Sequence, residues 1–227
     1  MEGVPPVDIL NPELKANPTR DWNAVYVPYC DGSFFAGDVE IDDNLNGKGK
    51  RIHRGLANLT GAFEVAAFHV PSPRRVLLAG SSGGAYGLLL GGPLLRHYFP
   101  EAELYLMADS GIGLARTADA EYITLPLEEF KAKDFVPAEC EDCIVSGHLT
   151  PLLGWMLDQD PGLRVGMYSS WYDGILAAVF LQIPWSDFAD ALKTQSDALA
   201  EGYPDRFRRF ITDGTQHTAL IGDASGV

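Results

Sequence analysis

Short apolar runs alternate with longer amphipathic stretches along most of this chain, and this pattern constrains the fold more than any other feature. The apolar runs have the length of strands, whereas the longer stretches space their apolar residues as helices do. Strands separated by helices predict βαβ units and a mostly parallel sheet with helices on both faces. The predicted strands are residues 23–29, 75–79, 103–108, 163–169 and 208–212, and the predicted helices are residues 55–69, 84–98, 151–158, 174–182 and 186–201.

The 227 residues contain no internal repeat, low-complexity tract or linker. A chain of this length is large enough to bury a substantial core. We therefore expect one α/β domain over residues 1–227, with a looser segment at residues 109–146.

The segment LLAGSSGGAYG, residues 77–87, lies where a predicted strand ends and a helix begins. It lacks the lysine of a phosphate-binding loop and the glycine spacing of a dinucleotide-binding loop. It does match G-x-S-x-G, the nucleophile elbow of α/β hydrolases. We therefore predict Ser82 as a nucleophile and the amide of Gly83 as a donor to an oxyanion at the helix N-terminus. A glycine–serine turn without chemistry is the alternative.

A serine nucleophile needs a base and a carboxylate that orients the base. His217 follows the last predicted strand, where the base of an α/β hydrolase lies. The acid lies between serine and histidine in the chain, and Asp173, which follows the strand at residues 163–169, is the preferred candidate. Asp109 and Asp213 are the other candidates.

The formal charge of −14 argues against nucleic acid or an anionic membrane as a partner. No apolar run reaches the length of about 20 residues that a membrane span requires, and no signal peptide is apparent. The localisation stays open. We expect no cofactor, and no cluster of residues has the spacing of a metal site.

Three cysteines leave at least one thiol without a partner in the chain. We expect reduced thiols, with a local disulfide or redox pair between Cys140 and Cys143 as the alternative. A zinc site is disfavoured because no second Cys-x-x-Cys pair is present.

Six sequence blocks together resemble the pectin acetylesterase/Notum family of carboxylesterases. They are VPYCDGSFFAGDVE from Val27, HRG from His53, LLAGSSGGAYG from Leu77, MADSG from Met107, YSSWYDG from Tyr168 and DGTQHTAL from Asp213. The blocks occur in family order. The resemblance implies an α/β-hydrolase-like fold, a triad of Ser82, Asp173 and His217, and the removal of O-acetyl groups from a carbohydrate. It also implies an exported protein, since family members are usually secreted.

The chain departs from the family pattern in two places. Gly83 stands where the family has alanine, and no glycine-rich oxyanion segment precedes residue 23. We expect either a sequence that starts late or a substitute donor from Asp31 and Gly32, and the predicted strand at residues 23–29 would then be an exposed edge. The remaining alternatives are an acyl or lipid ester hydrolase of the Notum type and a catalytically impaired binding domain.

A polyanionic glycan would need a basic patch on this acidic protein. The candidates nearest the blocks are Arg51, Arg54, Arg74 and Arg75, and solvated surface charges are the preferred interpretation of all four. A neutral acetylated glycan is therefore as good a substrate hypothesis as pectin.

Overall fold

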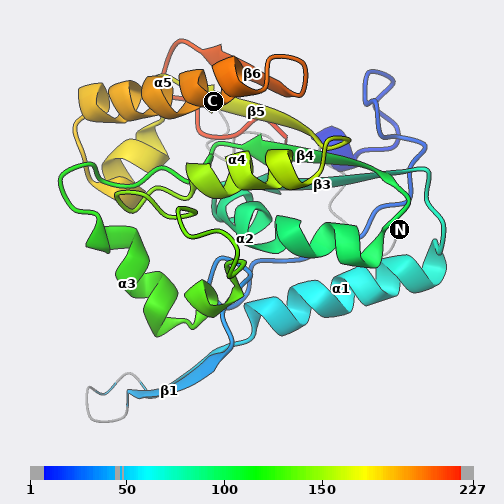
Figure 1. The fold of residues 1–227 in the computed structure, drawn as a ribbon, viewed down its shortest axis with the longest axis horizontal. Helices are drawn as coiled ribbons and strands as arrows, with labels where there is room; N and C mark the ends of the chain where they lie inside the picture. Colours follow the sequence, from blue (N-terminus) through cyan, green and yellow to red (C-terminus); the bar gives the residue numbers. More distant parts are fainter. Residues whose placement is uncertain (1–7, 44–46, 48, 221–227) are drawn as a thin grey trace.

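The computed structural model describes residues 8–43, 47 and 49–220. Its main sheet has four parallel strands in the order β3-β4-β5-β6, and Figure 1 shows them in the upper half of the view, with β6 near the top. Four of the five predicted strands are confirmed. Their bounds are Arg75–Ser81 for β3, Glu103–Asp109 for β4, Arg164–Ser170 for β5 and Phe207–Thr212 for β6.

Helices connect and cover these strands, so the fold is of the predicted α/β class. Helix α2 packs against β3, β4 and α1, and α5 packs against β6. The connection between β5 and β6 begins with the π-helix η4, where an α-helix was expected. The helices are α1 (Gly55–His69), α2 (Gly83–Tyr98), α3 (Glu121–Glu129), α4 (Thr150–Gln159), η4 (Ile175–Leu181) and α5 (Trp185–Gly202), with short turns η1 (Asp8–Leu10) and η3 (Ala132–Phe135).

Burial follows the position of each strand in the sheet. The inner strands β4 and β5 carry fully buried side chains such as Leu104, Leu106 and Val165. The outer strands β3 and β6 are half-buried or exposed along much of their length. Parallel strands present their carboxyl ends at one edge of a sheet, so the residues that follow β3 to β6 converge there.

The prediction of a strand at residues 23–29 is wrong. This segment belongs to no strand, and it runs beside β3 with Val25, Tyr26 and Tyr29 between 43% and 51% exposed. Its apolar composition predicted burial within a sheet. The side chains instead line a groove that is open to solvent.

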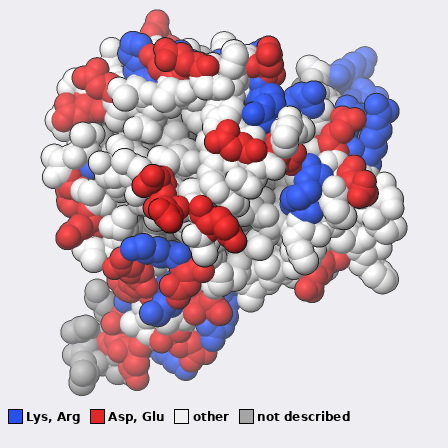
Figure 2. Space-filling model, in the orientation of Figure 1, with Lys and Arg blue, Asp and Glu red and all other residues white. Residues whose placement is uncertain are grey.

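An antiparallel hairpin of β1 (Val39–Asp43) and β2 (Gly49–His53) was not predicted. Figure 1 shows it protruding from the body of the molecule. Figure 2 shows positive and negative side chains intermixed at its lower left, where the hairpin lies. Arg51 pairs with Asp43 and Glu129, and Arg54 pairs with Asp38 and Glu40. Further along the chain Arg74 pairs with Glu103, and Arg75 lies over the ring of Trp22. The four candidate arginines therefore already have partners within the protein.

The expectation of reduced thiols is wrong for two of the three cysteines. Cys140 and Cys143 form a disulfide, and Cys30 is free and exposed. Among the described residues no single helix is long and apolar enough to cross a membrane; the pair η4 and α5, bent by 107°, meets the same test jointly by length and composition alone.

Candidate active site

Ser82 occupies a sharp turn between β3 and α2. Its backbone has φ 55° and ψ −118°, a conformation that few non-glycine residues adopt. Its N–H donates to the carbonyl of Asp109 at 2.8 Å, which continues the pairing of β3 with β4. Its own carbonyl accepts the N–H of Ala85 at 2.9 Å in the first turn of α2. The turn thus has the strand–turn–helix form of a nucleophile elbow.

Glycine at position 80 makes this turn sterically feasible. A Cβ on Gly80 would lie 2.1 Å from the carbonyl oxygen of Gly84, which is a main-chain atom and not the end of a flexible side chain. The glycines of the G-x-S-x-G segment therefore allow the end of β3 and the start of α2 to approach each other closely.

His217 and Asp173 meet at the same edge of the sheet. Nδ1 of His217 lies 2.9 Å from both carboxylate oxygens of Asp173, which is completely buried. Oδ1 of Asp173 also accepts the backbone N–H groups of Ile175 and Leu176 at 3.0 and 2.8 Å. When Nδ1 donates its proton to this carboxylate, Nε2 carries the free lone pair and can act as a base.

Backbone hydrogen bonds fix the loops that carry these two residues. Tyr172 and Gly174 donate their N–H groups to the carbonyls of Gly214 and Thr215, each at 3.1 Å. These bonds hold the loop after β5 against the loop after β6. The pairing of His217 with Asp173 therefore follows from the parallel register of two neighbouring strands.

The other candidate acids have different surroundings. Asp213 is exposed. Asp109 is buried, and its carboxylate accepts the hydroxyl of Ser81 and the amides of Ala219 and Leu220. The structure therefore brings Asp173, of the three, to the imidazole.

Gly83 is the first residue of α2, so its amide lies at the positive end of the helix dipole. A Cβ on Gly83 would lie 3.0 Å from the ring of Tyr29, which places that ring directly beside the predicted oxyanion donor. The hydroxyl oxygen of Tyr29 accepts the N–H of Phe34 at 3.0 Å, and the partial burial of this side chain raises the pKa of its phenol. Tyr29 lies in the YCDG block, but no role was predicted for it.

Asp31 and Gly32, the predicted substitute donors, lie in the turn that follows Tyr29. The carboxylate of Asp31 accepts the N–H and the hydroxyl of Ser33 and the N–H of Arg54. Its carbonyl contacts Nδ1 of the buried His53 at 2.9 Å, and Gly32 takes a positive φ of 69°. These contacts give the two residues a part in holding the turn, and a role as oxyanion donors stays a prediction.

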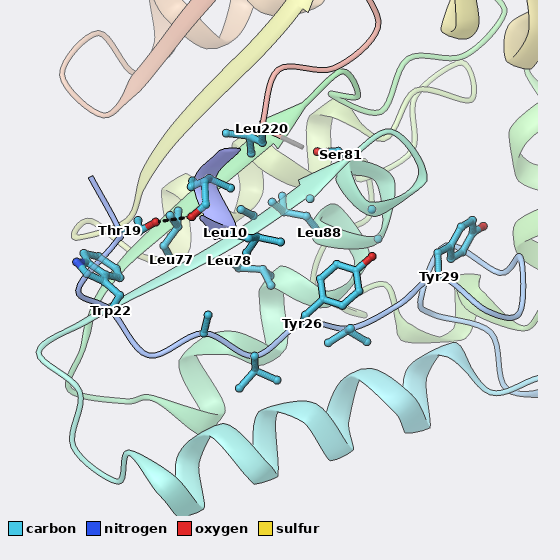
Figure 3. A pocket seen from close by; sticks show the side chains of 18 of the residues that line it. Leu10, Thr19, Trp22, Tyr26, Tyr29, Leu77, Leu78, Ser81, Leu88 and Leu220 are labelled. Carbon is cyan, nitrogen blue, oxygen red and sulfur yellow. Dashed lines mark hydrogen bonds between the residues drawn. The ribbon is translucent and has the colours of Figure 1, made fainter. Parts of the chain in front are cut away.

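A groove of about 470 Å³ lies along β3 and reaches Ser82. Figure 3 shows Leu77 and Leu78 on one side and Trp22 and Tyr26 on the other, with Leu220 near the end that carries Ser81. Most of its lining is apolar, and it includes residues 80–84 of the elbow. The groove can therefore hold an apolar group next to the nucleophile.

Among the described residues no group of three or more His, Cys, Asp and Glu side chains has the arrangement of a metal site. The buried His148 accepts the N–H of Ala115 through Nδ1 at 3.0 Å, and burial lowers the pKa of its imidazole. His148 therefore makes a structural contact with Ala115, a residue that is not part of the elbow.

Comparison with known protein families gives a match to the first half of the chain. The model of the pectinacetylesterase family matches residues 5–123, just over half of the chain, which includes Ser82 but neither Asp173 nor His217. Pectin acetylesterases 11 and 7 of Arabidopsis thaliana are each 30% identical over 108 residues, which cover 45% of this chain and 26% of either relative. The chain thus spans about a quarter of the length of these curated relatives.

Solved structures match nearly the whole chain. The Wnt deacylase Notum from Drosophila has a TM-score of 0.64 in one crystal form and 0.63 in another, with 18% and 19% identity. The match covers 96% of this chain and about two thirds of the Notum chain. At this identity the likeness shows a shared fold.

Proposed function

Because this chain belongs to the pectinacetylesterase family, we propose that it is a serine carboxylesterase whose catalytic residues are Ser82, His217 and Asp173. One observation carries the proposal: a histidine held by a buried carboxylate lies at the edge of the sheet where Ser82 occupies an elbow. A serine hydroxyl is a weak nucleophile until a base accepts its proton, and Nε2 of His217 is the available base.

The reaction follows from these positions. The hydroxyl oxygen of Ser82 attacks the ester carbonyl while its proton passes to Nε2 of His217. The N–H of Gly83 donates to the oxyanion of the tetrahedral intermediate. The imidazolium, stabilised by Asp173, returns the proton to the departing alcohol. Water then cleaves the acyl-enzyme by the same route, with His217 as base.

The proposed substrate is an O-acetyl ester of a carbohydrate, as the names of the plant relatives suggest. The four candidate arginines of the sequence analysis are paired with carboxylates or stacked on Trp22, and the net charge of the chain is −14. These features favour a neutral acetylated glycan over a polyanionic one.

Esters of longer acyl chains are the second candidate, because the apolar groove beside Ser82 offers them a surface. Burying a methylene contributes about 0.8 kcal/mol, so an acyl chain bound in the groove would raise kcat/KM up to about fourfold per methylene. Turnover of p-nitrophenyl esters from acetyl to decanoyl separates the candidates, since an acetylesterase loses activity as the chain lengthens.

A fluorophosphonate probe tests the nucleophile directly. We expect one adduct, located on Ser82 by peptide mass spectrometry, and no adduct in Ser82→Ala. Ser186→Ala, on the exposed start of α5, is the matched control and should label like the wild type. A folded wild-type protein that neither labels nor hydrolyses p-nitrophenyl acetate would contradict the proposal and favour a binding domain.

A further inference from the structure

Asp109 is a fully buried carboxylate at the carboxyl end of β4 whose contacts join two parts of the site. Oδ1 accepts the N–H of Ala219 at 2.9 Å. Oδ2 accepts the N–H of Leu220 at 3.0 Å and the hydroxyl of Ser81 at 2.5 Å. A polar group buried away from water needs hydrogen bonds in place of its lost hydration, and these three donors supply them.

The donors flank the proposed catalytic residues. Ser81 immediately precedes Ser82, while Ala219 and Leu220 follow His217 by two and three residues. The backbone carbonyl of Asp109 also accepts the N–H of Ser82 at 2.8 Å. Asp109 thus contacts the elbow through both its main chain and its side chain. Through its side chain it also contacts the loop that carries His217, residues 213–220, here called the histidine loop.

The histidine loop is held on both sides of His217. Before the histidine, the carbonyls of Gly214 and Thr215 accept amides from the loop after β5. After the histidine, two successive amides of the loop donate to the carboxylate of Asp109. The position of the imidazole therefore depends on Asp109 as well as on its own contact with Asp173.

We propose that Asp109 is a positioning residue that fixes the His217 loop relative to the Ser82 elbow. This inference rests on the proposed function. Asp109 touches neither the imidazole nor the reacting hydroxyl; it acts by supplying one acceptor oxygen to each loop amide while it holds Ser81. A displacement of about 1 Å between base and nucleophile lowers turnover by about 10²-fold, so loosening this anchor should affect chemistry more than binding.

The Asp109→Asn variant tests the proposal with little change in volume. Asparagine offers one acceptor oxygen for two loop amides, so one amide would face an NH₂ group. We expect kcat on p-nitrophenyl acetate to fall about 10²-fold while KM stays within about threefold. The far-downfield proton resonance of His217 Nδ1–H, which reports its hydrogen bond to Asp173, should broaden or vanish without any substrate present.

Asp160→Asn is the matched control. Asp160 is a half-buried carboxylate that accepts Arg96 Nε at 3.1 Å and the N–H of Gly162 at 2.9 Å, away from the site. We expect this variant to unfold at a lower temperature while kcat and the His217 resonance stay as in the wild type. If Asp109→Asn behaves in the same way, Asp109 is merely structural and the proposal fails.

Ala219→Pro provides a second route should Asp109→Asn fail to fold. It removes one donor from the exposed loop and leaves the buried carboxylate in place. The same loss of kcat and of the resonance is expected, and unchanged values would overturn the proposal. A wild-type protein that does not label at Ser82 would refute the esterase function, while the His217 resonance would still decide whether Asp109 holds the loop.

Discussion

His217 and Asp173 are 44 residues apart in sequence, yet Nδ1 of the imidazole lies 2.9 Å from each oxygen of the carboxylate. One of these oxygens also accepts the first two amides of η4. The acid is therefore held by a helix start, and in turn it fixes which nitrogen of the imidazole carries the proton. A substitution at Asp173 can keep its contact with the start of η4 while it changes its contact with the imidazole.

Asp173→Asn should keep the fold and lose the chemistry. The amide oxygen of asparagine can still accept the amides of Ile175 and Leu176, but its NH₂ group would face Nδ1 and favour the wrong tautomer. We expect kcat on p-nitrophenyl acetate to fall about 10⁴-fold with little change in circular dichroism. Asp187→Asn, in the first turn of α5, should leave kcat unchanged. Wild-type turnover by Asp173→Asn would remove Asp173 from the triad.

Gly80→Ala and Gly61→Ala should have opposite effects on stability. The new Cβ at position 80 would meet the Gly84 carbonyl at 2.1 Å, so we expect the free energy of unfolding to fall by about 3 kcal/mol or more. Gly61 lies within α1 with open space around its Cβ position, so alanine there should add up to about 1 kcal/mol. Urea unfolding of both variants measures the difference. A stable Gly80→Ala protein would show that the elbow is less tightly closed than the structure describes.

His148 should make the protein less stable in weak acid. Burial lowers the pKa of its imidazole below the ordinary value of about 6.5, so the unfolded chain takes up this proton at a higher pH than the folded chain. The free energy of unfolding should therefore fall as the pH drops below about 6.5, and this contribution levels off below the folded-state pKa. In His148→Gln the amide oxygen can accept the N–H of Ala115 without titrating.

Urea unfolding at pH 5 and pH 7.5 measures this contribution as the difference between wild type and His148→Gln. His97→Gln, at the exposed end of α2, is the control for replacing a histidine outside this contact. Identical pH dependence in wild type and His148→Gln would contradict the assignment.

Thiol counting should distinguish Cys30 from the other two cysteines. We expect one reactive thiol per denatured chain before reduction and three afterwards. The disulfide closes a very short loop, so its loss in the double variant Cys140→Ser/Cys143→Ser should cost about 2 kcal/mol of stability at most. Cys30→Ser should cost nothing measurable. Three thiols in the unreduced chain would show that the disulfide does not form.

Hydrophobic periodicity was sufficient to predict four strands of the sheet and most helices, because the inner strands β4 and β5 and the helices α2, α4 and α5 bury apolar side chains. It failed at residues 23–29, where an apolar run lies in an open groove instead of pairing with a strand. It also missed the β1–β2 hairpin, whose sequences VEIDD and GKRIH are strongly charged, and α3, which contains Pro126.

The candidate site was partly predictable for a similar reason. Ser82, Asp173 and His217 each follow a strand, so their sequence positions place them at one edge of the sheet; their catalytic roles stay predictions. The contacts of Asp109 were not predictable, because two of its three donors are backbone amides more than 100 residues away. Main-chain donors leave no signature in residue type.

The backbone conformation of Ser82 lowers the stability of the protein at the same residue whose hydroxyl the proposed reaction requires. Non-glycine residues held at φ 55° and ψ −118° carry a conformational strain on the order of 1–3 kcal/mol, whereas glycine adopts positive φ freely. A Ser82→Gly protein would therefore melt at a higher temperature than the wild type while lacking the hydroxyl. Selection for thermal resistance alone would favour the loss of this serine, and only selection for turnover would retain it.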